Sequence, residues 1–143
     1  MSIFKYNLLR KFDMKNWALI LGASSGFGAA ACKELAKAGI NIYGIHLDRK
    51  AGMPQVEKLI EEIKQYNVTV EFKNMSATDE NKRKDVINHL CEMQNINIKI
   101  LMHSLAFGAL KPMVDGNSEN ELKQNQIEMT LDVMANSLIY WTQ

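Results

Sequence analysis

Apolar positions along the chain switch repeatedly between two spacings, and each switch predicts a new element. Short runs of apolar and β-forming residues, which are typical of strands in a parallel sheet, occupy 17–21, 40–45, 68–72 and 96–102, and the third of these has alternating character. Between them, apolar residues recur at helical spacing, as in the alanine-rich segment 29–38. Strand–helix alternation with short connections predicts an α/β fold: a Rossmann-type doubly wound parallel sheet with helices on both faces.

The remaining helices are predicted from their start signals and their inward-facing residues. Pro54 suits the first turn of a helix, and Thr78 or Asp79 is a possible N-cap of the next one. Ser118-x-x-Glu121 matches a capping box, which predicts a long helix from there to the last residue. The helix that starts at Pro54 has a predicted inner face of Val56, Leu59, Ile60 and Ile63. The helix after Thr78 or Asp79 has a predicted inner face of Val86, Ile87, Leu90 and Met93.

Composition and charge narrow the classes of partner. The formal net charge of the 143 residues is +1, which leaves no basic excess for nucleic acid or a membrane surface, and no apolar run is long enough to span a bilayer. Cys32 and Cys91 have no metal-ligand spacing and fit a reducing cytoplasm. Residues 1–14 lack a signal-peptide core, so we interpret them as an extension before a domain of residues 15–143.

The motif with the clearest chemistry lies between the first strand and the first helix. Gly22-Ala23-Ser24-Ser25-Gly26-Phe27-Gly28 has the spacing G-x-x-x-G-x-G. Gly22 permits a tight turn, Gly26 allows a pyrophosphate to approach the backbone, and Gly28 permits close packing of the helix on the sheet. Free amides at the helix start and the hydroxyls of Ser24 and Ser25 would face the anion.

These residues resemble the cofactor loop of the short-chain dehydrogenase/reductase family. Three later stretches match other landmarks of that family in the same order: Asn74-Met75 after the third strand, His103-Ser104-Leu105-Ala106 after the fourth, and Met134–Leu138 in the last helix. The His-Ser variant is similar to bacterial enoyl-acyl-carrier-protein reductases. The resemblance covers about residues 15–143.

The resemblance implies an NAD(P)-dependent oxidoreductase that transfers hydride to a carbonyl or, as the His-Ser variant favours, an enoyl thioester. It places NAD(P)-binding residues at all four strand ends: Gly22, Ser24, Ser25, Gly26, Phe27, Gly28, His46, Arg49, Asn74, Met75, His103, Ser104, Leu105 and Ala106. His103 is expected to have a positioning role near the nicotinamide ribose rather than to transfer protons. The substrate would enter only a site completed by a C-terminal half.

Cofactor preference depends on the end of the second strand. An acid there binds the ribose 2′-hydroxyl, whereas an arginine accommodates a 2′-phosphate. Counting from Gly39 puts His46 at the acid position, with Asp48 and Arg49 just beyond. The absence of a carboxylate at position 46 and the presence of Arg49 both favour NADP over NAD. Asp48 would favour NAD if it turned inward, and the alternative of a solvated loop stays open.

The family's catalytic tyrosine and lysine have no counterpart here. Tyr6, Tyr43 and Tyr66 lie too early in the chain, and no lysine follows Tyr140. Asn136 matches the family's active-site asparagine and is the one member of the catalytic set present. We therefore expect this to be the cofactor-binding half, truncated after the fourth strand and the following helix and inactive alone.

Two further interpretations stay open. The chain could be a non-catalytic NAD(P)H-binding or subunit-interaction module, or a doubly wound protein that binds no dinucleotide. A sheet that stops at the fourth strand would leave one side of the last helix uncovered, which predicts a homo-oligomer or a longer gene product. The residues on that side are Leu131, Met134, Leu138 and Trp141.

Overall fold

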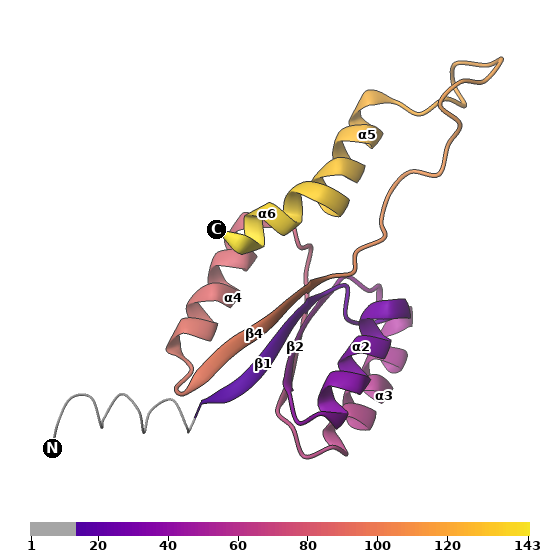
Figure 1. Cartoon of the computed structure of the whole chain (residues 1–143). Helices are drawn as coiled ribbons and strands as arrows, with labels where there is room; N and C mark the ends of the chain where they lie inside the picture. Colours follow the sequence, from indigo (N-terminus) through magenta and orange to yellow (C-terminus); the bar gives the residue numbers. More distant parts are fainter. Residues whose placement is uncertain (1–13) are drawn as a thin grey trace, which may run out of the picture.

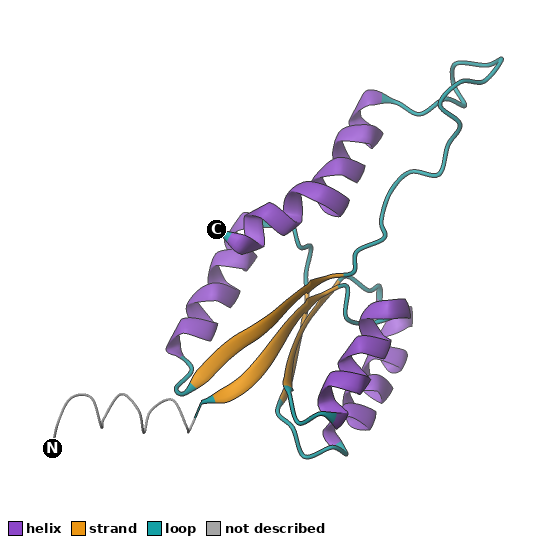
Figure 2. Cartoon of the chain, viewed as in Figure 1, coloured by secondary structure: helices purple, strands orange, loops and turns teal. Residues whose placement is uncertain are grey.

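The computed structural model describes residues 14–143 and contains one parallel sheet (Figures 1 and 2). Tyr6 and the predicted extension up to residue 13 lie outside the described residues. The strands are β1 (Lys15–Leu21), β2 (Asn41–His46), β3 (Val70–Asn74) and β4 (Ile96–His103), in the order β3-β2-β1-β4. The predicted parallel sheet is thus confirmed, with β1 and β2 at its centre.

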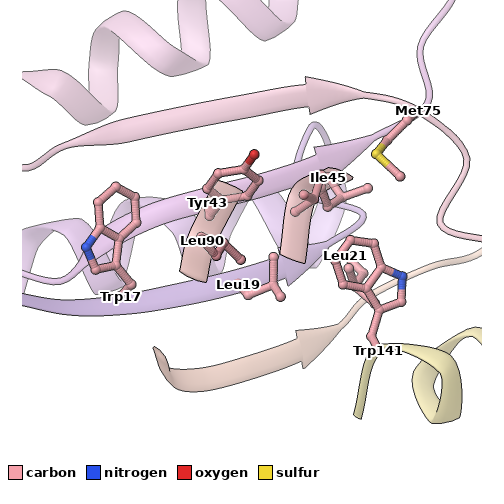
Figure 3. Packing of buried hydrophobic residues seen from close by; sticks show 9 residues of the cluster. Trp17, Leu19, Leu21, Tyr43, Ile45, Met75, Leu90 and Trp141 are labelled. Atoms are coloured by element: carbon pink, nitrogen blue, oxygen red, sulfur yellow. The ribbon is translucent and has the colours of Figure 1, made fainter. Parts of the chain in front are cut away.

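Helices cover both faces of this sheet, as a doubly wound fold requires (Figure 1). One face carries α2 (Gly26–Lys37) and α3 (Met53–Lys64), which follows the short 3₁₀ turn η1 (Lys50–Gly52), and the other carries α4 (Glu80–Glu92). Side chains of β1 alternate between two cores because successive strand residues point to opposite faces. The core on the α4 side contains Trp17, Leu19, Leu21, Tyr43, Ile45, Met75, Val86, Leu90 and Trp141 (Figure 3). The core on the α2–α3 side contains Ala18, Ile20, Ala23, Cys32, Ala36, Ile42, Leu59 and Ile63.

The predicted starts of the helices between the strands are confirmed at Pro54 and Asp79. Pro54 lies in the first turn of α3, and the carboxylate of Asp79 caps α4 by accepting the Lys82 N–H at 3.1 Å. Two predicted inner residues are less enclosed than expected, because Ile60 is half-buried and Ile87 is 38% exposed.

The third strand begins two residues later than predicted. Asn67 adopts a left-handed conformation with φ of 58°, and the Thr69 N–H donates to the Asn41 side chain at 2.7 Å instead of joining a strand ladder. Regular pairing starts at Val70 opposite Ile42 and continues to Asn74 opposite His46. The polar end of β3 is therefore drawn alongside the end of β2.

The predicted capping box at Ser118 is wrong. The Glu121 carboxylate accepts the Asp115 N–H at 2.9 Å and closes a loop instead of capping a helix. The helix α5 begins later, over Gln124–Leu131, where the Gln126 side chain accepts the Lys123 N–H at 3.1 Å. A π-helical turn, η2 (Asp132–Asn136), then leads into α6 (Ser137–Thr142).

The uncovered side of the last helix is smaller than expected. Leu131, Met134 and Leu138 are 54%, 45% and 40% exposed, but Trp141 is only 6% exposed. Its ring packs into the core on the α4 side (Figure 3), and its Nε1–H donates to the Ala77 carbonyl at 2.9 Å. Trp141 therefore fastens the end of the chain to the loop after β3.

Across residues 14–143, none of the helices has both the length and the apolar character needed to cross a bilayer.

Replacing Trp141 tests whether this contact anchors the last helix. Trp141→Ala should lower the free energy of unfolding by about 3–5 kcal/mol, the usual cost of emptying a buried tryptophan site. Urea unfolding followed by circular dichroism measures it. Leu138→Ala, on the exposed side of the same helix, is the matched control and should cost less than about 1 kcal/mol. Equal losses in the two variants would contradict the anchoring role.

Two buried groups that lose a proton at high pH, a thiol and a phenol, predict a loss of stability in alkali. Burial raises the pKa of Cys32 from 9.0 to about 12, and burial together with the Glu71 carboxylate raises the pKa of Tyr43 from 10.0 to about 12. Because the unfolded chain releases these protons first, the free energy of unfolding should fall as pH rises from about 9 towards 12.

The variant Tyr43→Phe isolates one of the two contributions. The Tyr43 hydroxyl is buried without a hydrogen-bond partner, so its removal should cost little at neutral pH. Above pH 10, each group contributes at most about 1.4 kcal/mol per pH unit, and urea unfolding of the variant should show a shallower fall. Parallel curves for the two proteins would rule out this origin.

Candidate functional site

A pocket of about 330 Å³ opens at the carboxyl ends of the strands, where ligands bind in such sheets. It lies between the glycine turn after β1 and the segments that follow β2, β3 and β4. Its walls are formed by Gly22, Ser24, Ser25, Gly26, Phe27, Ile45, His46, Leu47, Asp48, Met75, Ser76, Ala77, Ser104, Leu105, Ala106, Phe107 and Val133. A larger hollow of about 890 Å³ lies beside β4 and α4, but almost all of its lining is apolar.

The glycine turn requires glycine at two positions for different reasons. Gly22 follows the last residue of β1 and has φ of +86°. A Cβ added there would lie 2.2 Å from the Ser104 carbonyl oxygen. Gly28 packs directly on this turn, since its Cβ would lie 1.9 Å from the Gly22 carbonyl oxygen. The start of α2 is thus held against the end of the central strand.

This packing directs the first amides of α2 at the pocket. The first helical bond runs from the Ala29 N–H to the Ser25 carbonyl at 3.1 Å, so the amides of Gly26, Phe27 and Gly28 have no intrahelical acceptor. Ser25 makes no side-chain cap and the first turn has no acidic residue. Gly26 has φ of +54° with open space around it. The positive end of the helix dipole therefore faces the pocket and is not neutralised by an acid in the helix's own first turn.

The acid of the site is Asp48, which sequence counting placed outside the expected position. Its side chain lines the pocket, and its Oδ2 accepts a hydrogen bond from His46 Nδ1 at 2.8 Å. Asp48 lies 20 residues after Gly28, which is the usual offset between the last glycine and the ribose-binding acid. Arg49 is exposed and does not line the pocket. Counting from Gly28, rather than from Gly39, would have identified Asp48.

Hydrogen bonds determine the charge state of this carboxylate. Partial burial raises the pKa of Asp48, but hydrogen bonds from Ser24 and His46 outweigh it, so that its pKa is lowered from 3.8. The carboxylate is therefore ionised at neutral pH, and the His46 Nδ1 must be the donor. The pocket wall at Asp48 therefore carries a negative charge.

Asn74 has a different position from the one predicted. Its side chain points to the backbone of the β2 loop, where Oδ1 accepts the Asp48 N–H at 3.1 Å and Nδ2 donates to the Asp48 carbonyl at 2.9 Å. Only its neighbour Met75, which is 4% exposed, lines the pocket. Asn74 holds residue 48 in place instead of facing the cavity.

The segment after β4 divides in the same way. Ser104, Leu105 and Ala106 line the pocket, but His103 does not. His103 Nε2 lies 2.8 Å from the hydroxyl of Ser137, and that hydroxyl donates to the Val133 carbonyl at 2.7 Å. Because Ser137 then has only acceptor capacity left, His103 must donate through Nε2. His103 thereby joins the end of β4 to the last helix.

Asn136, the predicted catalytic residue, lies at the end of the π-helical turn, is exposed, and does not line the pocket. The nearby hydroxyl of Tyr140 donates to Asp132 Oδ1 at 2.7 Å. This hydrogen bond raises the pKa of Tyr140. The Tyr140 hydroxyl is thus bonded within the last helical segment itself.

The pocket therefore gathers most of the predicted residues. Ten of the fourteen predicted cofactor residues line it, and the four that do not are Gly28, Arg49, Asn74 and His103. Gly28, Asn74 and His103 instead support residues that do. Sequence reasoning left out Ile45, Leu47, Ser76, Ala77, Phe107 and Val133, and it considered Asp48 without including it among the predicted cofactor residues. Within residues 14–143, no three His, Cys, Asp or Glu side chains are placed to hold a metal ion.

Comparison with known proteins connects this geometry to a family. The sequence profile described as "short chain dehydrogenase" matches residues 16–143. No curated protein matches the chain in a sequence search.

Among solved structures, a short-chain dehydrogenase/reductase from Serratia marcescens is 20% identical with a TM-score of 0.71, over 92% of this chain and 49% of that one. A 3-oxoacyl-[acyl-carrier protein] reductase from Brucella melitensis in complex with NAD is 18% identical with a TM-score of 0.71, over 91% and 47%. An NADH-dependent reductase complexed with NAD is 19% identical with a TM-score of 0.68, over 93% and 51%. These likenesses show the fold, and the chain spans about half the length of these structures.

The contact between Gly28 and Gly22 is open to a direct test. Gly28→Ala places a methyl group against a backbone carbonyl and should destabilise the fold by at least about 3 kcal/mol, because neither backbone segment can move without shifting α2 or β1. Thermal unfolding followed by circular dichroism measures the effect. Gly116→Ala, where nothing lies within 4 Å of the added carbon, is the control. A melting temperature of Gly28→Ala equal to that of the control would refute the contact.

Proposed function

The chain belongs to the short-chain dehydrogenase family, and we propose that it is the dinucleotide-binding half of an NAD(P)-dependent oxidoreductase. The observation that supports this most directly is the turn at Gly22–Gly28, whose unbonded amides face a pocket at the end of the central strand. The bound nicotinamide would supply hydride transfer to a carbonyl or enoyl thioester.

The residues of the pocket fit a dinucleotide from its diphosphate outward. The amides of Gly26 and Phe27, with the hydroxyl of Ser25, are the donors available to the diphosphate, whereas the Ser24 hydroxyl is directed at Asp48. No acidic residue in the first turn of α2 opposes an anion there. Met75 and Ala77, buried after β3, offer an apolar wall for the adenine. Ser104, Leu105 and Ala106 lie on the side towards the nicotinamide ribose.

The position of Asp48 supports NAD, rather than the NADP that Arg49 suggested from sequence. An ionised carboxylate in the pocket wall accepts hydrogen bonds from ribose hydroxyls and repels a 2′-phosphate. Arg49 precedes the turn η1 and is exposed, away from the pocket wall. NAD is therefore the cofactor we propose.

The chemical step needs groups that this chain does not bring to the pocket. None of the tyrosines among the described residues lines it. His103 and Asn136 would then serve a completed site indirectly, His103 by holding β4 to the last helix and Asn136 through the π-helical turn. A C-terminal half would supply the proton donor and the substrate pocket.

A non-catalytic NAD(H)-binding or subunit-interaction module is the second candidate. The exposed apolar side chains of the last helix, Leu131, Met134 and Leu138, favour it, because they form a surface for another subunit. A homo-oligomer in the cytoplasm, with two free cysteines in a reducing environment, is compatible with both candidates. The two candidates differ in a completed protein: the first predicts steady-state reduction of enoyl or 3-oxoacyl thioesters by NADH once a C-terminal half supplies the proton donor, whereas the module would bind NADH without turnover in any assembly.

Cofactor choice is tested by exchanging the charge at residue 48. Asp48→Asn should weaken NADH binding about ten-fold or more, since a hydrogen bond to a charged group contributes about 1.5–3 kcal/mol. It should leave NADPH binding unchanged or tighter, because the repulsion of the 2′-phosphate is removed. Fluorescence titration with each nucleotide gives the Kd values.

Arg49→Gln is the matched control for this exchange and should alter neither Kd by more than about two-fold. The opposite pattern, in which Arg49→Gln weakens NADPH selectively and Asp48→Asn changes nothing, would assign the site to NADP. Absence of saturable binding of either nucleotide to the unmodified chain would refute the proposed function.

A further inference from the structure

His46 is an unusual residue for the interior of a sheet. It is the last residue of β2 and is 3% exposed, one of the few polar side chains buried among the described residues. Its ring lies against Phe72, with centroids 5.9 Å apart. A buried imidazole is costly unless its polar atoms are bonded, and its Nδ1 is committed to Asp48 at 2.8 Å.

The carboxylate that His46 contacts is held from several sides. Ser24, in the glycine turn, is near enough to help lower the pKa of this carboxylate. Asn74 grips the backbone of the same residue at both its N–H and its carbonyl. Side chains from the ends of β1, β2 and β3 thus converge on one acid. The Asp48 side chain nevertheless keeps 27% of its surface exposed, at the pocket wall.

We propose that His46 is a positioning residue that orients the Asp48 carboxylate towards the ribose of the dinucleotide. The inference rests on the proposed function and goes beyond it by assigning a role to the buried neighbour of the acid. With Oδ2 committed to His46, the carboxylate cannot rotate freely, and the Asp48 side chain is held in a fixed orientation where it lines the pocket. The ribose 2′-hydroxyl then meets an acceptor that is already oriented.

This arrangement also accounts for the position of the acid two residues beyond the strand. A carboxylate beyond the end of the strand would otherwise lose side-chain freedom when it binds a ligand, and that loss weakens binding. The bond from a rigidly buried ring removes that cost before the ligand arrives. Leu47, between the two residues, is 65% exposed and supplies no such support.

The test compares NADH with its analogue that lacks the adenosine 2′-hydroxyl, in the full chain and three variants. His46→Leu removes the donor and keeps an apolar side chain in the buried site. His46→Asn keeps an N–H donor near the position of Nδ1. His89→Leu is the matched control, because it breaks a similar pair, His89 Nε2 to Glu71 at 2.9 Å, away from the pocket.

The proposal predicts a change in discrimination, not only in affinity. The unmodified chain should prefer NADH over the 2′-deoxy analogue about ten-fold or more, as a charged hydrogen bond implies. His46→Leu should reduce this ratio to about two-fold, whereas His46→Asn and His89→Leu should keep it within about a factor of two of the unmodified chain. In an Asp48→Asn background, His46→Leu should change the ratio no further.

Several results would overturn the proposal. An unchanged ratio in His46→Leu, or an equal fall in His89→Leu, would mean that His46 acts only in the fold. Melting temperatures of the variants separate a loss of folding from a loss of discrimination, and failure of His46→Asn to restore the ratio in a folded protein would also count against it. If the unmodified chain bound no NADH, the proposed function would fall together with this inference, whereas binding with unchanged discrimination would refute the inference alone.

Discussion

The contact between Gly28 and the Gly22 carbonyl sets the geometry on which the site depends. Because no side chain separates the two backbones, the first turn of α2 lies against the end of β1. That proximity points unbonded amides into the pocket at the strand ends, where the helix dipole is most positive. A bulkier residue at either position would move the helix, and the anion site would be lost with it.

Around this turn, the fold places groups of opposite polarity in the wall of one pocket. The amides of α2 face one part, and the ionised carboxylate of Asp48 faces another. A dinucleotide carries a matching pattern of anionic diphosphate and hydroxyl-bearing ribose. Residues that do not touch the pocket maintain the pattern: Asn74 fixes the β2 loop, and His103 fixes the last helix through Ser137. The site is therefore supported by hydrogen bonds between strand ends that are distant in sequence.

The sequence predicted most of this fold because its strong signals are local. Apolar runs and the Gly22–Gly28 spacing identify the central strands and the cofactor turn without tertiary information. The errors occur where tertiary contacts compete with local patterns. Glu121 accepts a hydrogen bond from the Asp115 N–H instead of capping a helix at Ser118. Trp141, which was predicted to lie on an uncovered surface, packs into the core and donates to the Ala77 carbonyl. The orientation of Asp48 depends on partners that are distant in sequence or buried, such as Asn74 and His46, which no local pattern indicates.

The most direct measurement is the change in backbone amide chemical shifts when NADH is added to the ¹⁵N-labelled chain. Saturable binding should produce its largest shifts at residues 24–28, with a second group at residues 46–48. The Ala38–Ile40 turn, at the opposite end of α2, should not respond. A saturable response confined to the apolar hollow beside β4 and α4, or no response at residues 24–28, would contradict the claim that this glycine turn binds a dinucleotide.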